Sequence, residues 1–164
     1  IEPGERRSRD TFYQKLVWVV DGARRKREGA QFLNALKRAI PIGSNSPIRR
    51  TFSDECVILR EWVGSHAPVF FDFGGEHVLW WILKRTPDGS AYVAPFSRSD
   101  FMEIHRGGAT QKARDFEEFV KDLSKLVSQY ESHLMTQALK RARPLPAQGF
   151  QQYQMRRSNL RRRF

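Results

Sequence analysis

Apolar residues in this chain fall into short runs separated by turn residues, and each run indicates one structural element. The first run, Leu16–Val20, is closed by Asp21 and Gly22 and follows a charged segment that begins at Pro3. Proline is favoured in the first turn of a helix, and a β-branched run that ends at Asp-Gly is typical of a buried strand. Residues 1–22 are therefore expected to form a helix and then a buried strand.

This first strand raises the question of its neighbours. A buried strand must hydrogen-bond to other strands, yet the chain begins at Ile1, without a methionine and with no strand ahead of the helix. We interpret the start as the end of a larger α/β unit and expect the chain to be a fragment or a processed product. The residues that carry chemistry would then be encoded upstream of Ile1.

Residues 68–101 carry the pattern of an antiparallel meander. Two apolar runs flank the Gly74–Gly75 pair, which is a hairpin signature, and a third run follows the Thr86–Gly89 turn. The adjacent Trp80–Trp81 pair must point to opposite faces of its strand, so both faces of the sheet are expected to be covered. Pro95, in the third run, indicates that this strand lies at an edge or ends there.

Helical spacing marks the residues ahead of the meander. The segment Gln31–Ile40 places four apolar residues on one stripe, namely Phe32, Leu33, Leu36 and Ile40. A Gly/Ser/Asn/Pro-rich loop follows, and Ser53 is then expected to cap a helix over Asp54–Val63, in which Glu61 shares a face with apolar residues. Cys56 in that helix is expected to be a packed core thiol, because no base is recognisable beside it.

A long helix is expected over Thr110–Arg143, which contains neither Gly nor Pro. An a/d seam runs along it at spacings of 4-3-4-3-4, over Phe116, Val120, Leu123, Val127, Tyr130 and Leu134. Packing of this seam on the chain's own domain is favoured over a dimeric coiled coil, because Phe119 and Leu126 widen the stripe. A weak homodimer through the long helix stays open as the alternative.

Composition adds limits to this picture. The 164 residues, 40% of them apolar, suffice for one ordinary domain with a sizeable core. No apolar run approaches the ~18 residues of a membrane span, and a single Cys suits a reducing, cytoplasmic setting. The predicted fold class is α+β: a helix and strand, a three-stranded antiparallel meander packed with helices, a long C-terminal helix and a basic tail.

The net charge of +11 is unevenly distributed. Residues 1–50 carry +7, residues 51–131 carry −4, and residues 132–164 carry +8 without a single acid. Basic ends around an acidic middle favour contact with a polyanion, of which nucleic acid is the commonest. The alternative is that the charge only keeps the chain soluble and solvates a disordered tail.

Two groups of cations are candidate phosphate contacts. The first directly follows the first strand: Arg24, Arg25, Lys26 and Arg27. The second lies in the tail after the long helix: Arg156, Arg157, Arg161, Arg162 and Arg163. Phe150 and Tyr153 could stack on bases while these arginines meet phosphate. A merely solvated tail is the alternative.

Catalytic motifs are absent from the sequence. The Asp72–Gly74 triplet spells the kinase metal-binding motif, but no Gly-rich phosphate loop and no HRD segment accompany it. Metal-dependent nucleases often place an Asp and a Glu-x-Lys on adjacent strands, where they hold Mg²⁺ and orient the attacking water. Here no Asp or Glu is followed two residues later by Lys or Gln. We therefore expect no catalytic residue and no cofactor site in this chain.

The chain opens with IEPGERRSRDTFYQKLVWVVDG, which resembles the competence protein CoiA-like family, whose members look like nucleases of the PD-(D/E)xK type. In that family a strand with Glu-x-Gln precedes a helix with spaced Arg and a Tyr, and a Trp-containing apolar strand comes next. Arg6, Arg9 and Tyr13 would lie on this helix, and Trp18–Gly22 would form the last core strand and its exit. Residues 68–101 are more loosely similar to the region downstream of the family's core.

The resemblance implies a division of the chain into three regions. These are the last helix and strand of a restriction-endonuclease-like core (1–28), an accessory α+β domain with the long helix (29–143) and a disordered Arg-rich tail (144–164). It also implies that Arg6, Arg9 and Tyr13 line the DNA side of the core. The full-length protein would cleave DNA, in single-stranded form, by Mg²⁺-dependent hydrolysis during transformation or recombination. Because the family's Asp and Glu-x-Gln are missing here, this chain alone is expected to be inactive.

Three functions stay open at this point. The chain is the C-terminal part of a CoiA-like DNA nuclease, a non-catalytic module that clamps nucleic acid between its basic ends, or an interaction protein that dimerises through the Phe116–Leu134 seam. The first two share DNA as the partner and differ in whether an upstream catalytic site exists.

Overall fold

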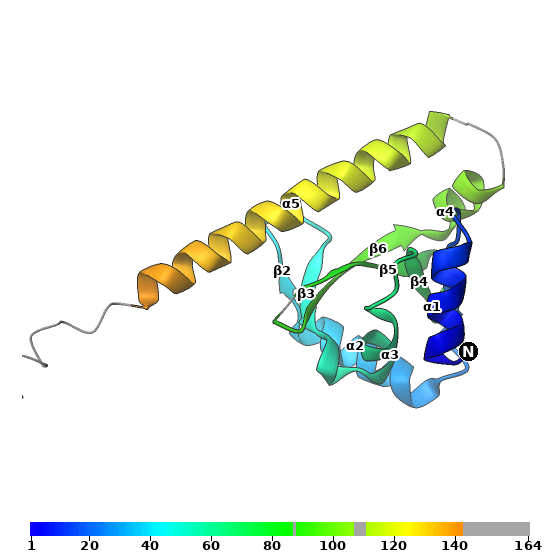
Figure 1. Ribbon diagram of the computed structural model, residues 1–164, viewed down its shortest axis with the longest axis horizontal. Helices are drawn as coiled ribbons and strands as arrows, with labels where there is room; N and C mark the ends of the chain where they lie inside the picture. The colour runs from blue at the N-terminus through cyan, green and yellow to red at the C-terminus, as the bar shows by residue number, and fades with distance from the viewer. Residues whose placement is uncertain (87, 107–110, 143–164) are drawn as a thin grey trace, which may run out of the picture. The chain divides into compact units, whose positions relative to one another are not determined.

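The computed structural model describes residues 1–86, 88–106 and 111–142, which form a mixed α+β fold around one six-stranded sheet (Figure 1). The α+β class expected from the sequence is confirmed. The chain divides into two compact units, Ile1–Val127, which holds the sheet, and Ser128–Phe164. The tail over 144–164 lies outside the described residues.

Six strands and five α-helices make up the described part of the chain. The strands are β1 (Trp18–Asp21), β2 (Ile40–Pro41), β3 (Arg49–Phe52), β4 (Val69–Asp72), β5 (Val78–Arg85) and β6 (Ser90–Ser97). The helices are α1 (Pro3–Phe12), α2 (Lys26–Arg38), α3 (Val57–Trp62), α4 (Arg98–His105) and α5 (Gln111–Arg141), with a 3₁₀ helix over Ser53–Glu55. The strand order is β1-β4-β5-β6-β3-β2; β1 runs parallel to β4, and every other neighbouring pair is antiparallel.

The strands β4, β5 and β6 form the meander that the sequence predicts. Gly74 and Gly89, in its two turns, have φ values of 78° and 82°, which L side chains rarely adopt. The first half of β6 is an inner strand because β3 pairs with it, whereas Pro95 lies beyond the β3 pairing and faces only Trp80 of β5. The proline therefore occupies a stretch of β6 with one free side, as its missing amide hydrogen requires.

The strand β1 lies at one edge of the sheet, and the prediction that it is buried is wrong, because Val19 and Asp21 are exposed and Trp18 and Val20 are only partly covered. It pairs with β4 in parallel, from Trp18 beside Val69 to Asp21 beside Asp72. Its neighbour thus comes from later in the chain, whereas the sequence interpretation looked for neighbours ahead of Ile1. This pairing places the first strand and the meander in one sheet, across the boundary expected at residue 28.

One face of the sheet packs against α2 and α3 in a dense core. Phe32 of α2 is fully buried among the rings of Phe71, Phe73 and Trp80, at centroid distances of 5.5, 4.9 and 5.8 Å. Cys56 is buried in the same core, as expected of a packed thiol, and burial raises its pKa.

The opposite face carries a second aromatic cluster. Trp81 stacks on Phe70 at 5.5 Å and contacts Phe96 of β6 and Phe116 of α5 at 6.1 and 5.5 Å. Because Trp80 and Trp81 point to these two different clusters, the prediction of a sheet covered on both faces is confirmed. The seam of α5 contributes the buried residues Leu123 and Val127, while a homodimer through it stays a prediction.

Two helix predictions need correction. The helix α2 spans Lys26–Arg38 rather than Gln31–Ile40, so part of the basic segment is helical. Leu33 is half-exposed rather than buried, and Ile40 is a half-exposed residue of β2 rather than part of the helical stripe. Ser53 caps no helix, because its hydroxyl donates to the carbonyl of Gly89 at 2.9 Å in the turn between β5 and β6. A 3₁₀ turn and the shorter α3 therefore replace the single predicted helix.

Candidate nucleic-acid interface

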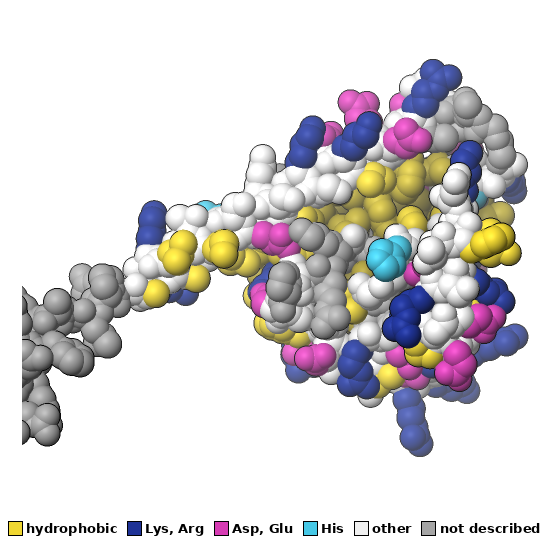
Figure 2. Space-filling view, in the orientation of Figure 1, with side chains coloured by type: hydrophobic (Ala, Val, Ile, Leu, Met, Phe, Trp, Pro, Cys, Tyr) yellow, Lys and Arg dark blue, Asp and Glu magenta, His cyan; other side chains and the backbone are white. Residues whose placement is uncertain are grey.

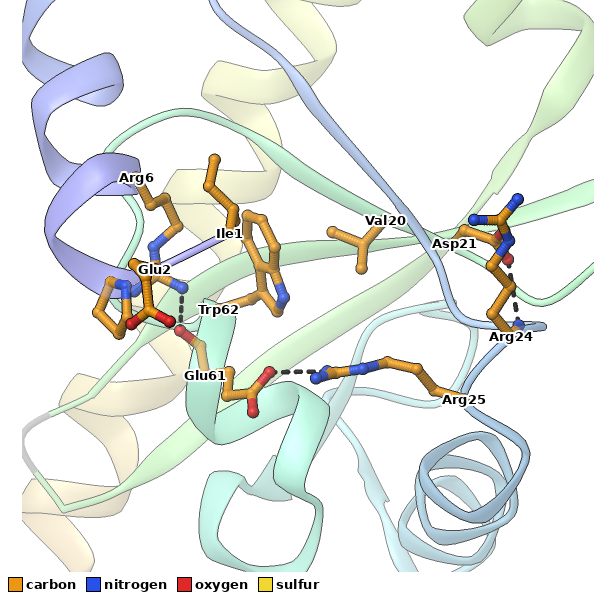
Figure 3. A pocket seen from close by; sticks show the side chains of 10 residues that line it. Ile1, Glu2, Arg6, Val20, Asp21, Arg24, Arg25, Glu61 and Trp62 are labelled. Carbon is orange, nitrogen blue, oxygen red and sulfur yellow. Dashed lines mark hydrogen bonds and ion pairs between the residues drawn. The ribbon is translucent and has the colours of Figure 1, made fainter.

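A groove of about 530 Å³ opens beyond the carboxyl end of β1, between the start of α1 and the end of α3 (Figure 3). The residues that line it are Ile1, Glu2, Pro3, Arg6, Val20, Asp21, Arg24, Arg25, Glu61 and Trp62. Ligands of open α/β sheets bind beyond the carboxyl ends of their parallel strands, and β1–β4 is the parallel pair of this sheet. Whether this region can bind an anion depends on which of the cations around the groove are not already paired within the fold.

Arg6 is occupied by contacts within the fold. Its guanidinium lies over the ring of Trp62, 5.0 Å from the centroid, and donates to the backbone carbonyl of Glu61 (Figure 3). Trp62 is itself buried and packs edge-on against Trp18 of β1 at 5.4 Å. These contacts attach α1 to the end of α3, so Arg6 binds phosphate only if they are released.

Arg25 is occupied in the same way. Its Nη1 lies 2.7 Å from Oε2 of Glu61 on α3 and 2.7 Å from Oε2 of Glu28 one turn along α2. The hydrogen bond to Glu61 raises the pKa of Arg25 and holds the guanidinium charged. Two carboxylates thus neutralise this arginine and fix the start of α2 to α3.

Arg24 is held more weakly. Asp21 accepts hydrogen bonds from the backbone amides of Ala23 and Arg24 at 3.1 and 3.2 Å, which shapes the turn that leaves β1. The Nε of Arg24 lies 3.0 Å from the same carboxylate, but the side chain is 87% exposed. Such an exposed ion pair contributes ~0–1 kcal/mol, so Arg24 can exchange Asp21 for a phosphate.

Lys26 and Arg27 form the first turn of α2 and are both exposed. Neither makes an ion pair with any residue that the structure describes. The residue ahead of them, Arg25, caps the helix without a side-chain hydrogen bond, and Glu28, the acid of the first turn, pairs with Arg25 rather than with Lys26 or Arg27. Lys26 and Arg27 are thus unpaired cations among the described residues, at a helix start whose dipole favours anions.

The charges inside the groove balance, whereas those on its margin do not. Three arginines of the lining are matched by three carboxylates, Glu2, Asp21 and Glu61. Figure 2 shows Lys and Arg side chains projecting around the lower part of the molecule, intermixed with acidic ones. Cations without an ion pair to a described residue therefore lie on the margin, at Lys26 and Arg27, rather than inside the groove.

The candidates on α1 differ from one another. Arg9 pairs with Glu5 at 2.5 Å on the helix surface, and Tyr13 is exposed at the helix end. Asp10, between them, faces inward and accepts hydrogen bonds from the indole of Trp18, the hydroxyl of Ser65 and the amide of His66. Burial opposes ionisation of this carboxyl, but the three hydrogen bonds outweigh it and hold its pKa below the usual value.

The carboxylates of the parallel strand pair do not fit a magnesium site. Asp21 and Asp72 are register partners at the strand ends, but Arg98 lies 2.5 Å from Asp72 and, with the amide of Gly74, holds its pKa below the usual value. Asp21 is likewise used by its own turn and by Arg24. The described residues hold no group of three or more His, Cys, Asp or Glu side chains that could bind a metal ion.

Glu61 and Trp62 organise the groove, although the sequence pointed to neither as a site residue. One signal was visible, because Glu61 is an acid on the apolar stripe of its helix. The second group of cations cannot be placed, since Arg156, Arg157, Arg161, Arg162 and Arg163 lie outside the described residues.

In comparisons with known proteins, no family model, no curated protein and no solved structure matches the chain. Among the helices that the structure describes, none has both the length and the apolar character needed to span a membrane.

Proposed function

We propose that this chain binds nucleic acid through backbone phosphates and that Lys26 and Arg27, at the start of α2, make the central contact. The observation that carries the proposal is the division among the cations near β1. Arg6 and Arg25 are used by the fold, whereas Lys26 and Arg27 project into solvent without ion pairs among the described residues. Exposed cations such as Lys26 and Arg27 can exchange water and counterions for phosphate without the loss of a contact that stabilises the fold.

DNA in single-stranded form is the partner we propose, and binding occurs without cleavage by this chain. Binding without cleavage is supported by the carboxylates at the ends of β1 and β4. Asp21 and Asp72 are each paired with an arginine and so are already used by the fold. The Arg-rich residues 156–163 would add further phosphate contacts. Truncation after Pro146 is accordingly expected to weaken binding, and unchanged affinity would remove the tail from the proposal.

A second candidate function is that the chain is the C-terminal part of a CoiA-like nuclease. What supports it is the order of α1 and β1, which agrees with the helix and strand that the resemblance calls for, and the position of β1 at a sheet edge that a further strand could extend. Reading the coding DNA upstream of Ile1 tests this directly. Finding neither an Asp nor a Glu-x-Gln or Glu-x-Lys there would defeat the nuclease candidate.

Binding and cleavage are separated by one experiment. The purified chain is titrated with a labelled single-stranded oligonucleotide at several salt concentrations, with and without Mg²⁺. We expect the logarithm of the binding constant to fall steeply and linearly with the logarithm of the salt concentration. The oligonucleotide should stay intact with and without Mg²⁺. Affinity independent of salt would contradict phosphate binding, and Mg²⁺-stimulated cleavage would contradict a non-catalytic module.

A further inference from the structure

Phe12 and Tyr13 form an exposed aromatic pair where α1 ends. The two side chains are 77% and 54% exposed, and their rings meet edge-to-face at 5.0 Å with an interplanar angle of 84°. Large apolar side chains lie mostly inside folded proteins, and here two neighbours in sequence stand in solvent together. Beyond their contact with each other, no ring contact joins them to another described residue.

The charges around this aromatic pair are cationic on the exposed side. Arg9 lies three and four residues ahead of the two aromatics and so shares their side of the helix. Its ion pair with Glu5 at 2.5 Å is half-exposed and contributes little, so Arg9 can exchange Glu5 for a phosphate. Lys15 follows them and is exposed, without an ion pair to any described residue. The nearest acid in sequence, Asp10, is turned inward by its bonds to Trp18, Ser65 and His66, so it does not offset these cations.

We propose that the aromatic pair Phe12–Tyr13 is a stacking site for unpaired bases of single-stranded nucleic acid. This inference rests on the proposed function and deepens it by naming the element that distinguishes single strands from duplexes. Aromatic rings next to cations bind single strands because every base offers a π-face to the ring while the cation meets the phosphate. In a duplex the bases are already stacked on one another, so exposed rings gain little from it.

The position of the aromatic pair agrees with this role. Phe12 and Tyr13 precede the amino end of β1, and Lys26 and Arg27 follow its carboxyl end. The strand β1, four residues or ~13 Å long, lies between the two groups in the chain, together with residues 14–17 and 22–25. Compact single-strand-binding domains cover about 4–16 nucleotides, so one oligonucleotide can reach both.

The test uses the full chain, a single-stranded thymidine oligonucleotide and a duplex of the same length. For the double variant Phe12→Ala/Tyr13→Ala we expect affinity for the single strand to fall about tenfold or more, and affinity for the duplex to stay within about twofold. The matched control is Phe52→Ala, which removes an exposed aromatic on β3 whose ring also has an arginine, Arg50, 5.4 Å away. We expect this control to change neither affinity.

A second variant separates stacking from simple apolar contact. Phe12→Leu/Tyr13→Leu keeps much of the apolar surface and removes the rings, so we expect it to behave like the alanine double variant, whereas Tyr13→Phe should bind like the original chain. Equal loss for single strand and duplex, or full binding by the leucine variant, overturns the stacking site. A change in sedimentation of the alanine variant would show instead that the aromatic pair joins two copies of the chain.

Failure of the stacking site and failure of the proposed function give different results. If the original chain binds neither oligonucleotide, nucleic-acid binding itself is contradicted. If it binds both and the alanine double variant does so with unchanged affinities, only the stacking site is contradicted. Thermal unfolding of each variant serves as the folding control, and both aromatics are exposed enough that we expect no loss of stability.

Discussion

The groove beyond β1 and the first turn of α2 meet at Arg25 but use their cations in different ways. In the groove, Arg6 lies on Trp62, and Arg25 is shared between Glu28 and Glu61. In the first turn of α2, Lys26 and Arg27 are exposed and form no ion pair with a described residue. Basic composition therefore overstates the binding surface, because part of the positive charge stabilises the fold and only the remainder is free for a partner.

The largest effect is expected where the groove residues are buried. Replacing Trp62 by Ala removes a buried ring that packs on Trp18 and supports Arg6, so we expect a loss of about 3–5 kcal/mol in the free energy of unfolding. Trp62→Phe retains a ring for these contacts and should lose less. Urea denaturation of both variants measures this. Near-normal stability of Trp62→Ala would show that the groove is not part of the supporting structure.

A smaller and pH-dependent effect is expected for the attachment of α1. Asp10 has a pKa below its usual value in the fold, so its contribution to stability is complete above the unfolded pKa of about 3.9 and is lost as the pH falls through the folded pKa. Asp10→Asn should therefore be less stable than the original chain by about 1–2 kcal/mol at pH 7. The difference should vanish at the acid end of a pH series of denaturant titrations, and a difference constant with pH would contradict this role.

Arg25→Gln sharpens the comparison further. The substitution breaks the ion pairs to Glu28 and Glu61, which are partly exposed, so we expect a loss of about 1 kcal/mol or less in stability. Because Glu28 and Glu61 already neutralise Arg25, its loss should change the slope of log affinity against log salt concentration by less than the loss of a free cation such as Lys26 would. A slope change of a full unit would show that Arg25 leaves Glu61 for phosphate when nucleic acid binds.

The smallest stability effect is expected for the exposed first turn of α2. Lys26→Gln/Arg27→Gln removes no described ion pair, so the free energy of unfolding should change by less than ~0.5 kcal/mol. Thermal unfolding measures this directly. A large destabilisation would mean that Lys26 and Arg27, like Arg6 and Arg25, stabilise the fold. The distinction between the groove and the first turn of α2 would then be wrong.

The meander of the sheet could be predicted from the alternation of side chains along its strands and from the glycines in its turns. Contacts between residues distant in sequence could not be predicted. Trp80 and Trp81 divide between the two faces as alternation requires, and Gly74 and Gly89 mark the turns of the meander. The strand β3 escaped prediction because its Arg49–Phe52 sequence is polar and pairs only at a sheet margin, between β6 and the short β2.

The candidate site was predictable only in part for a similar reason. The basic run after β1 was visible as composition, but which cations were free depended on Glu61, which lies 36 residues after Arg25 in sequence. Ser53 shows the same limit, since its hydroxyl serves the carbonyl of Gly89 rather than a helix start. Side-chain partners that are distant in sequence are set by tertiary packing, and local pattern does not reveal them.

The central claim is that the free cations at the start of α2 contact phosphate. Two charge-matched double variants test it: Lys26→Gln/Arg27→Gln in the first turn of α2, and Lys37→Gln/Arg49→Gln at the end of α2 and on β3, whose cations are likewise exposed and form no ion pair with a described residue. In salt titrations of single-stranded DNA binding, the first should reduce the log–log slope by about two units and the second should leave it unchanged. Equal reductions by both variants, or none by the first, would contradict the account.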